Sequence, residues 1–516
     1  IIVLEPRRLA ARSIAARMSE IKGDELGKSI GYKIRFENKT SNETKIEVVT
    51  EGILTRLLQS DNALEEASII VFDEFHERSI HADLALALCL ETQQVLRPDL
   101  KIIIMSATIN ADEISKKINA EVISCEGKQY PVKINYGNGR DLKVISELCA
   151  EQILRASKEN EGDILAFLPG EAEIKKTEEL IKYKLDNTKV HPLYSALPYS
   201  LQKSAILPNT NGKRKVVLAT TIAETSLTIE GIKIVIDTGL TRVSKYNPKT
   251  GLSRLETVAI SKDAADQRAG RAGRLSPGIC YRLWSPADHD KLAEHRVPEI
   301  LESDLCPLML ELFQWGIRKP EDLFWLDFPP KIQIYKAIET LEQLNAIESN
   351  KITKHGNRMA QLPCHPRLAH MLILAEEMGK LALACDIAAL LEEKDPLGRE
   401  SGIDFNLRIE ALRRYRQQAA KGGKWERIEK IAASYRKMFK VDIDNSAFDY
   451  YDTGYLIASV YPEKIASSRP GNNSQFLMAN GKIAQAGPKD DLGFEPWLAV
   501  AAADEGDRIG RIFLAA

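Results

Sequence analysis

Residues 70–79, which read IVFDEFHERS, decide how the rest of the chain is interpreted. An apolar run at 70–72 ends at two adjacent carboxylates, Asp73 and Glu74. This pattern predicts a buried parallel strand that delivers acids to the carboxyl edge of an α/β sheet, where such sheets bind ligands. Two carboxylates suit a Mg2+ and nucleotide site there, because one can hold the metal while its neighbour orients or deprotonates the attacking water. An isolated Asp-Glu pair more often ends a strand and caps the next helix, so the flanking sequence decides.

Three flanking segments carry polar side chains at the expected ends of strands. After a strand at 1–4, EPRR at 5–8 opens a helix, where adjacent arginines suit either a phosphate clamp or a solvated helix start. TEGILTR at 50–56 predicts a helix whose start binds a phosphate, or one that is merely N-capped. SAT at 106–108, after a strand at 101–105, offers two hydroxyls that can hydrogen-bond the carboxylates.

A second series of strands and helices follows in the sequence. We expect strands at 163–168, 215–219 and 232–236 and a helix at 171–184. The tract ATTIAETSLTIEG at 219–231 is rich in Ser and Thr, which can contact phosphates and ribose without carrying charge. QRAGRAGR at 267–274 spaces three arginines so that they are expected to share one helix face. A basic surface helix would not need the glycines between them.

In order and spacing these segments resemble motifs Ia, Ib, II, III, V and VI of the DEAH/RHA helicases of superfamily 2, most closely the bacterial HrpB-type branch. FLPG at 167–170 is placed like motif IV. Phe75 departs from the family's alanine, while Asp73, Glu74 and His76 match. The specific resemblance covers about the first 300 residues. It implies ATP as substrate, Mg2+ as cofactor, single-stranded RNA as partner and arginine fingers at the γ-phosphate.

The resemblance also implies roles for individual residues. Catalysis falls to Asp73, Glu74, His76, Gln267, Arg271 and Arg274, with Asp73 and Glu74 also at the metal. Nucleotide contacts fall to Ser106, Thr108, Ser226, Thr228 and Glu230. Nucleic-acid contacts fall to Arg7, Arg8, Thr50, Arg56, Thr220, Thr221 and Thr225. We therefore expect an ATP-dependent RNA helicase that translocates on RNA, in the 3′-to-5′ direction typical of the family, and unwinds it.

The expected fold is α/β, with two RecA-like lobes built on parallel sheets and accessory winged-helix, helical-bundle and partial β-rich domains behind them. The expected boundaries are 1–128 for lobe 1, 129–300 for lobe 2, 301–362 for the winged helix with its wing near 347–353, 363–445 for the bundle and 446–516 for the β-rich region. Glycines and prolines near 126–138 predict a linker between the lobes.

Composition excludes several classes of protein. At 516 residues the chain is too long for one core and predicts about three to five domains. A net charge of −2 gives no global nucleic-acid signature. Seven cysteines without a C-x-x-C pair argue against a zinc site or a disulfide framework and favour a cytoplasmic protein. No run approaches the roughly 18 apolar residues of a membrane helix, so we expect no membrane partner.

The G-x-x-x-x-G-K-[ST] loop that holds ATP phosphates is absent from the sequence. LGKS at 26–29 is not such a loop, since Lys22 stands where its first glycine is required. The sequence opens in mid-strand without a methionine, so we expect a fragment, also short at its C-terminus, that is inactive without an upstream P-loop. Two alternatives remain open: a nucleic-acid-binding or scaffold protein without catalysis, and a DNA helicase, which shares every motif.

Residues 408–440 concentrate positive charge, with eleven Lys or Arg and three Glu. Tyr415, Trp425, Tyr435 and Phe439 lie among them. Aromatic rings that stack on bases, beside cations that hold phosphates, are typical of a single-strand channel. We hypothesise that part of this face lines an RNA exit; the alternatives are a solvated helical face and aromatics that form the helices' core.

Overall fold

The computed structural model describes residues 1–107, 111–125, 127, 130–139, 141–209, 212–224, 229–247, 252–418, 423–487, 490–504 and 509–516. These residues form two compact units, which we describe separately. The first comprises Ile1–Asp304 and Leu323–Pro330, and the second Leu305–Asp322 and Lys331–Ala516. No helix in the described ranges is long and apolar enough to cross a membrane.

The first lobe of unit 1 is a six-stranded sheet in the order β3-β2-β4-β1-β5-β6, parallel except for β3. Its strands are short and rich in Val and Ile, as buried parallel strands are. The strands are β1 (Ile2–Glu5), β2 (Ile30–Ile34), β3 (Glu37–Lys39), β4 (Ile46–Thr50), β5 (Ile69–Phe72) and β6 (Lys101–Ile104). The helices are α1 (Arg8–Lys22), α2 (Glu51–Ser60), α3 (Ile80–Val95) and α4 (Ala111–Ile118). The ends of β1, β4 and β5 therefore share one carboxyl edge.

The second lobe of unit 1 is an all-parallel sheet in the order β7-β14-β11-β8-β10-β9. Its strands are β7 (Val132–Tyr136), β8 (Asp163–Phe167), β9 (Thr188–Leu193), β10 (Arg214–Ala219), β11 (Ile232–Asp237) and β14 (Gly278–Arg282). The helices are α5 (Ile145–Glu159), α6 (Glu171–Ile181), α7 (Tyr199–Ile206), α8 (Lys262–Gly270) and α9 (Pro286–Asp290). The expected fold of two parallel-sheet lobes is confirmed.

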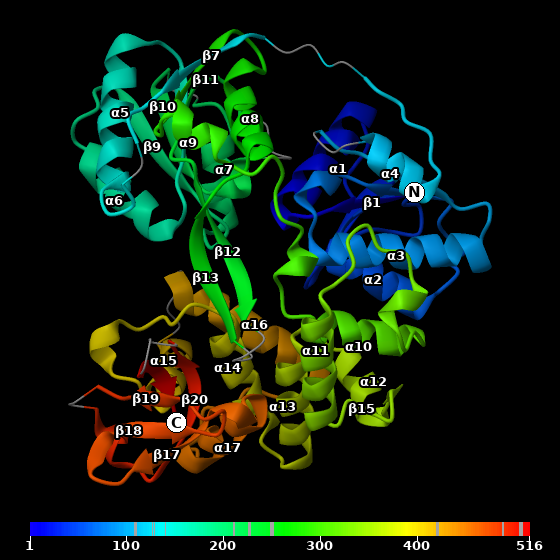
Figure 1. Ribbon diagram of the computed structural model, residues 1–516, viewed down its shortest axis with the longest axis vertical. Coiled ribbons are helices and arrows are strands. Elements are labelled where there is room, and N and C mark those ends of the chain that lie inside the picture. The colour runs from blue at the N-terminus through cyan, green and yellow to red at the C-terminus, as the bar shows by residue number, and fades with distance from the viewer. Residues whose placement is uncertain are drawn as a thin grey trace. The chain divides into compact units, whose positions relative to one another are not determined.

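Two parts of unit 1 differ from the sequence-based expectation. Residues 132–136 were expected within a linker but form β7, because β14, far along the chain, pairs with them from Gly278 to Arg282. Between β11 and α8, strands β12 (Leu240–Asn247) and β13 (Leu252–Ala259) form an antiparallel hairpin outside both main sheets (Figure 1).

Unit 2 begins with helices and a small hairpin. Helices α10 (Cys306–Trp315), α11 (Lys331–Gln343) and α12 (Lys354–Ala360) accompany the strands β15 (Ile347–Glu348) and β16 (Lys351–Ile352). The antiparallel pair of β15 and β16 lies where the wing was expected. The expected domain boundaries themselves stay predictions.

The rest of unit 2 is a helical bundle followed by a closed barrel. The helices are α13 (Pro366–Glu377), α14 (Leu381–Glu392), α15 (Asn406–Gln417), α16 (Gly423–Phe439) and α17 (Tyr450–Val460). The barrel strands are β17 (Ile465–Arg469), β18 (Asn472–Met478), β19 (Ile483–Gln485), β20 (Trp497–Ala503) and β21 (Gly510–Ala515), in the closed order β17-β18-β19-β21-β20 (Figure 1). The expected β-rich region is thus a barrel, but it is preceded by a helix, α17, that the sequence did not predict.

Candidate active site

Strand β5 delivers Asp73 and Glu74 to the carboxyl edge of the first sheet, as its apolar run predicts. The amide of Asp73 still follows the sheet, since it donates to the carbonyl of Leu4 at 3.0 Å. Glu74 then adopts a left-handed backbone with φ 49°, which is uncommon for a residue other than glycine and turns the chain sharply. The amide of Phe75 fixes this turn by donating to the carbonyl of Met105 at 3.1 Å.

The carboxylate of Asp73 fits the predicted metal. Burial raises its pKa, the hydrogen bond from the Glu74 amide opposes this, and the neighbouring Glu74 charge adds to it. A pair of carboxylates that destabilise each other is stabilised by a hard cation, and Mg2+ commonly uses one or two carboxylates plus substrate phosphates. Among the described residues no group of three or more His, Cys, Asp or Glu could hold an ion. Mg2+ at this edge stays a prediction.

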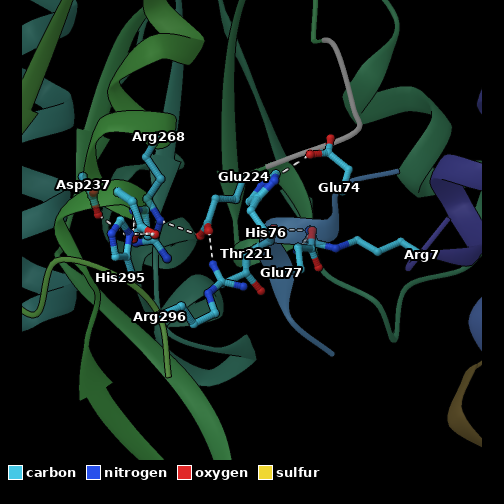
Figure 2. Close-up of polar contacts among 12 residues, drawn as sticks. Arg7, Glu74, His76, Glu77, Thr221, Glu224, Asp237, Arg268, His295 and Arg296 are labelled. Atoms are coloured by element: carbon cyan, nitrogen blue, oxygen red, sulfur yellow. Dashed lines mark hydrogen bonds and ion pairs between the residues drawn. The ribbon is translucent and has the colours of Figure 1, made fainter. Parts of the chain in front are cut away.

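His76 lies in the 3-10 turn Phe75–Glu77 that follows Glu74. Its ring is almost fully buried, and its Nε2 atom lies 3.4 Å from the Oε2 atom of Glu74 (Figure 2). Phe75, the residue that departs from the family's alanine, is buried and packs edge-on against Phe72 with ring centroids 6.0 Å apart. The substitution therefore fills the core beneath the turn and leaves the polar side chains in place.

The arginine motif has a different local structure from the one expected. Helix α8 ends at Gly270, and Arg271–Gly273 forms a 3-10 turn, so the three arginines do not share one helix face. Arg268 instead lies inside the lobe and pairs with Glu224 at 3.0 Å and Asp237 at 2.9 Å. The expectation of a common face was wrong because the helix ends between the first arginine and the second.

One glycine of this motif is required by close packing. A Cβ atom at Gly273 would come within 2.6 Å of the carbonyl oxygen of Tyr130. The amide of Tyr130 donates to the carbonyl of Gly273 at 3.0 Å, so the two backbones must stay this close. Gly270, by contrast, has nothing within 4 Å of such an atom.

Arg271 and Arg274 both lie within electrostatic reach of Glu74, although they come from the other lobe. Burial, aided by the charge of Arg274 and opposed by Glu74 and Glu224, lowers the pKa of Arg271 to about 9. Burial also lowers the pKa of Arg274, and Glu74 opposes it. Two adjacent arginines with lowered pKa values mark a place where additional negative charge would be favourable. The predicted γ-phosphate would supply it.

Glu224 is the centre of a buried ion-pair network that sequence reasoning did not single out. Besides Arg268, its carboxylate accepts from Arg296 (Figure 2). Its main-chain carbonyl accepts from Arg271 Nε at 2.8 Å. Burial alone would raise its pKa, but Arg296, Arg268 and Arg7 bring it down to about 2. Its only signal in the sequence was an acid within the Ser- and Thr-rich tract.

Arg7 is held between the lobes. Its guanidinium pairs with Glu77 at 2.9 Å in the first lobe and donates to the main-chain carbonyl of Thr221 in the second (Figure 2). The predicted nucleic-acid residue therefore already has two protein partners, of which Glu77 is another residue that sequence reasoning missed. Its contact with nucleic acid stays a prediction.

The other predicted nucleic-acid residues lie at carboxyl edges of the two sheets. Register between β1 and β4 pairs Glu5 with Thr50, so the starts of α1 and α2 are neighbours. Arg8 begins α1 and Arg56 lies midway along α2, and both side chains are exposed. Thr50 occupies the N-cap position of α2, but its side chain makes no capping hydrogen bond. Thr220 follows β10 directly and donates its amide to Leu193 at 3.2 Å.

The residues predicted to contact the nucleotide do not all lie at the same edge of their sheets. Ser106 follows β6, beside the strand end that carries Asp73, and Gln267 is half-buried on α8. The structure does not bring Glu230 to this edge: it precedes β11, at the amino edge, where Gly231 accepts from the Asp163 amide at 3.1 Å. β10 ends at the carboxyl edge of the sheet and the parallel strand β11 begins at its amino edge, so the two ends of the tract lie at opposite edges. Thr108, Thr225, Ser226 and Thr228 lie outside the described residues.

The basic segment of unit 2 is not a single basic surface. Arg416 donates to Asp386 at 2.8 Å, and Arg436 contacts the same buried carboxylate at 3.1 Å. Arg413 is buried and lies over the ring of Phe448 at 4.5 Å. The aromatics Trp425, Tyr435 and Phe439 belong to or pack against the hydrophobic core. The hypothesis of an RNA-lining face was wrong for these residues, because an acid outside the segment turns its arginines inward.

Two family models match the chain. Residues 1–116 match the DEAD/DEAH box helicase domain, and residues 143–276 match the helicase conserved C-terminal domain. These ranges include all of the predicted motifs and, within the network around Glu224, Arg268 and Asp237 but not Arg296.

Curated relatives and solved structures extend the similarity further. ATP-dependent RNA helicase HrpB of Escherichia coli K12 is 40% identical over 96% of this chain and 60% of its own length. Probable ATP-dependent RNA helicase DHR2 of Saccharomyces cerevisiae is 40% identical over 77% of this chain and 56% of its own. A crystal structure of the Escherichia coli DEAH/RHA helicase HrpB matches with a TM-score of 0.86 and 38% identity, over all of this chain and 64% of that one. The chain thus spans less than two thirds of these relatives.

Proposed function

The chain belongs to the DEAD/DEAH box helicases, and from this premise we propose that it forms the ATP-hydrolysing core of an ATP-dependent RNA helicase. The proposal rests above all on the electrostatic interaction of Glu74 in one lobe with Arg271 and Arg274 in the other, together with the hydrogen bond that anchors Arg271 to the carbonyl of Glu224. A carboxylate that can orient water, opposite two arginines that favour negative charge, is the arrangement that phosphoryl transfer to water requires.

Each residue then has a chemical task. Asp73 would hold Mg2+, which when bound would neutralise charge on the phosphates. Glu74 orients the attacking water and takes up its proton, with His76 beside it at 3.4 Å. Arg271, anchored by the carbonyl of Glu224, and the more exposed Arg274 stabilise charge that grows on the transferred phosphoryl group. Gln267 and Ser106 act at the rim of the same site.

RNA binding is proposed for the carboxyl edges of both lobes. Arg8, Thr50 and Arg56 contribute cations, a hydroxyl and helix amides, all suited to phosphate oxygens. Thr220, Thr221 and Thr225 contribute the corresponding groups of the second lobe. Closure of the lobes on ATP and their separation after hydrolysis would move this track along the strand, giving translocation and unwinding.

The test compares stimulation of ATP hydrolysis by single-stranded RNA and by DNA of the same sequence, in the full-length protein that contains this chain. We expect RNA to stimulate turnover more than DNA does. Greater stimulation by DNA would assign the protein to DNA, and no hydrolysis with either would favour a binding protein without catalysis.

A further inference from the structure

Residues 293–302, here called the strap, follow α9 and contact segments of both lobes. At one end, the amide of Lys262, the first residue of α8, donates to the carbonyl of Ala293 at 2.8 Å. At the other end, the carbonyl of Glu302 accepts from the amide of Tyr246 in β12 at 2.7 Å. Between these anchors, Arg296 and Glu299 reach the two halves of the candidate active site.

Glu299 holds the start of α3 in the first lobe. Its Oε2 atom accepts from the amide of Ile80 at 2.9 Å, and its own amide donates to the carbonyl of Arg78 at 3.0 Å. The local cap, Ser79, accepts from Ala82 at 3.0 Å. A carboxylate at a helix N-terminus is favourable, because the first amides have no partner within the helix. Glu299 therefore completes a cap from 219 positions away along the chain.

The loop that Glu299 holds is the one that carries Glu74. Left-handed residues, Glu74 and Arg78, both with φ 49°, flank the 3-10 turn between β5 and α3. Arg78 is fixed in turn by Asp83 at 3.1 Å and by Asp327 at 2.7 Å. Because the turn is short, a shift of Arg78 or of the start of α3 moves Glu74 as well.

Arg296 holds the second lobe, three positions before Glu299. Its guanidinium donates to the buried carboxylate of Glu224 (Figure 2). The main-chain carbonyl of Glu224 in turn anchors Arg271. Three residues of extended chain span at most about 10 Å. The loops that carry Arg271 and Glu74 therefore cannot separate far without breaking one of the two contacts.

We propose that the strap sets the position of Glu74 relative to Arg271, with Arg296 and Glu299 as positioning residues that hold the two loops in register. The consequence for hydrolysis rests on the function proposed above, but the mechanical link does not. Arg296 hydrogen-bonds Glu224 in the second lobe and interacts electrostatically with Glu77 in the first, so a change at Arg296 should be felt at the Glu74 loop.

Amide hydrogen exchange on this chain tests the link. Arg296→Ala and Glu299→Ala should each speed exchange of the amides at 74–82 by about tenfold, the effect of losing one hydrogen bond to a charged group. Glu299→Gln keeps a hydrogen-bond acceptor, so its exchange rate at 74–82 should lie between those of the alanine variants and the wild type. Arg296→Lys keeps a positive charge beside Glu224 and therefore serves as a second variant in case Arg296→Ala does not fold. It should also speed exchange at 74–82. Glu159→Ala, in an exposed pair on α5, is the matched control.

The result that would overturn the proposal is faster exchange around Glu224 alone in Arg296→Ala and Arg296→Lys, with residues 74–82 unchanged. In the full-length protein, Arg296→Ala and Glu299→Ala should each lower kcat for ATP hydrolysis about tenfold and change KM by less than about twofold. Glu299→Gln should lower kcat less than Glu299→Ala does. Absence of ATP hydrolysis in the wild type would refute the proposed function and leave the exchange test valid. Unchanged kcat in an active protein would refute positioning by the strap.

Discussion

Glu224→Gln should strongly destabilise the second lobe, although this residue has no catalytic role in the account. The wild-type carboxylate is buried and is held by Arg268 and Arg296. Glutamine keeps the shape and can accept a hydrogen bond, but it removes the charge that the surrounding arginines require. Breaking a buried ion pair by removing one partner costs about 3–5 kcal/mol.

The pKa of Glu224 gives a second, independent magnitude. It lies at about 2, against an ordinary value of 4.5. At about 1.4 kcal/mol per pKa unit, this shift is worth about 3 kcal/mol to the folded state. Since the folded pKa is lowered, the contribution is present above about pH 4.5 and is lost as pH falls toward 2. Both routes lead to a loss of about 3 kcal/mol in the variant at neutral pH.

The assay is urea unfolding of this chain, monitored by hydrogen exchange of the amides in β10 and β11. These two strands report on the second lobe alone. Glu230→Gln is the matched control, because Glu230 lies six positions away and is exposed; it should change stability by less than about 0.5 kcal/mol. The wild type should lose stability between about pH 4.5 and pH 2 more steeply than Glu224→Gln. A loss below about 1 kcal/mol, or an equal loss in the control, would refute the reasoning.

Three further changes test other parts of the molecule. Arg274→Ala should lower ATP turnover by roughly tenfold or more and ATP affinity far less, because charge grows there in the transition state; kinetics showing weaker affinity with normal turnover would remove Arg274 from the site. In urea unfolding, Arg416→Ala should lower the free energy of unfolding of unit 2 by about 3 kcal/mol, because it breaks the buried pair with Asp386. Arg414 is exposed, so Arg414→Ala should lower it by less than about 0.5 kcal/mol. Equal losses in the two variants would contradict the network around Asp386. Burial raises the pKa of Glu51 to about 7, so the folded state holds a proton that the unfolded chain releases; unfolding measurements should show unit 1 losing stability between about pH 5 and pH 8, and Glu51→Gln should flatten that slope.

The sequence was sufficient where structure and chemistry are local. The run at 70–72 followed by Asp73 and Glu74 predicted both a parallel strand and the carboxyl edge at which the two acids lie, because buried parallel strands are apolar and end at that edge. The strands β8, β10 and β11 were predicted for the same reason. Helix α17 was missed because its aromatic and β-branched residues favour strands, whereas Leu456, Ile457 and Val460 pack into the helical core.

Long-range pairing explains the remaining differences. Nothing near Ile80 in the sequence indicates that Glu299 caps it, and nothing in the arginine motif indicates that Glu224 turns Arg268 inward. Charge counting over 408–440 was misleading for the same reason, since the neutralising Asp386 lies outside the segment. A sequence shows which charges exist, and the fold decides which of them remain available to a ligand.

The most direct test of the central claim is ATP binding and turnover by Glu74→Gln in the full-length protein that contains this chain. We expect nucleotide binding to be retained, because Asp73 and the arginines remain. RNA-stimulated turnover should fall by about 100-fold or more, because the group that orients and deprotonates water is lost. Asp61→Asn, at the end of α2 and away from the strand edge, serves as the control for an acid-to-amide change. Near-normal turnover in Glu74→Gln would contradict the account and assign the water-side role to another residue.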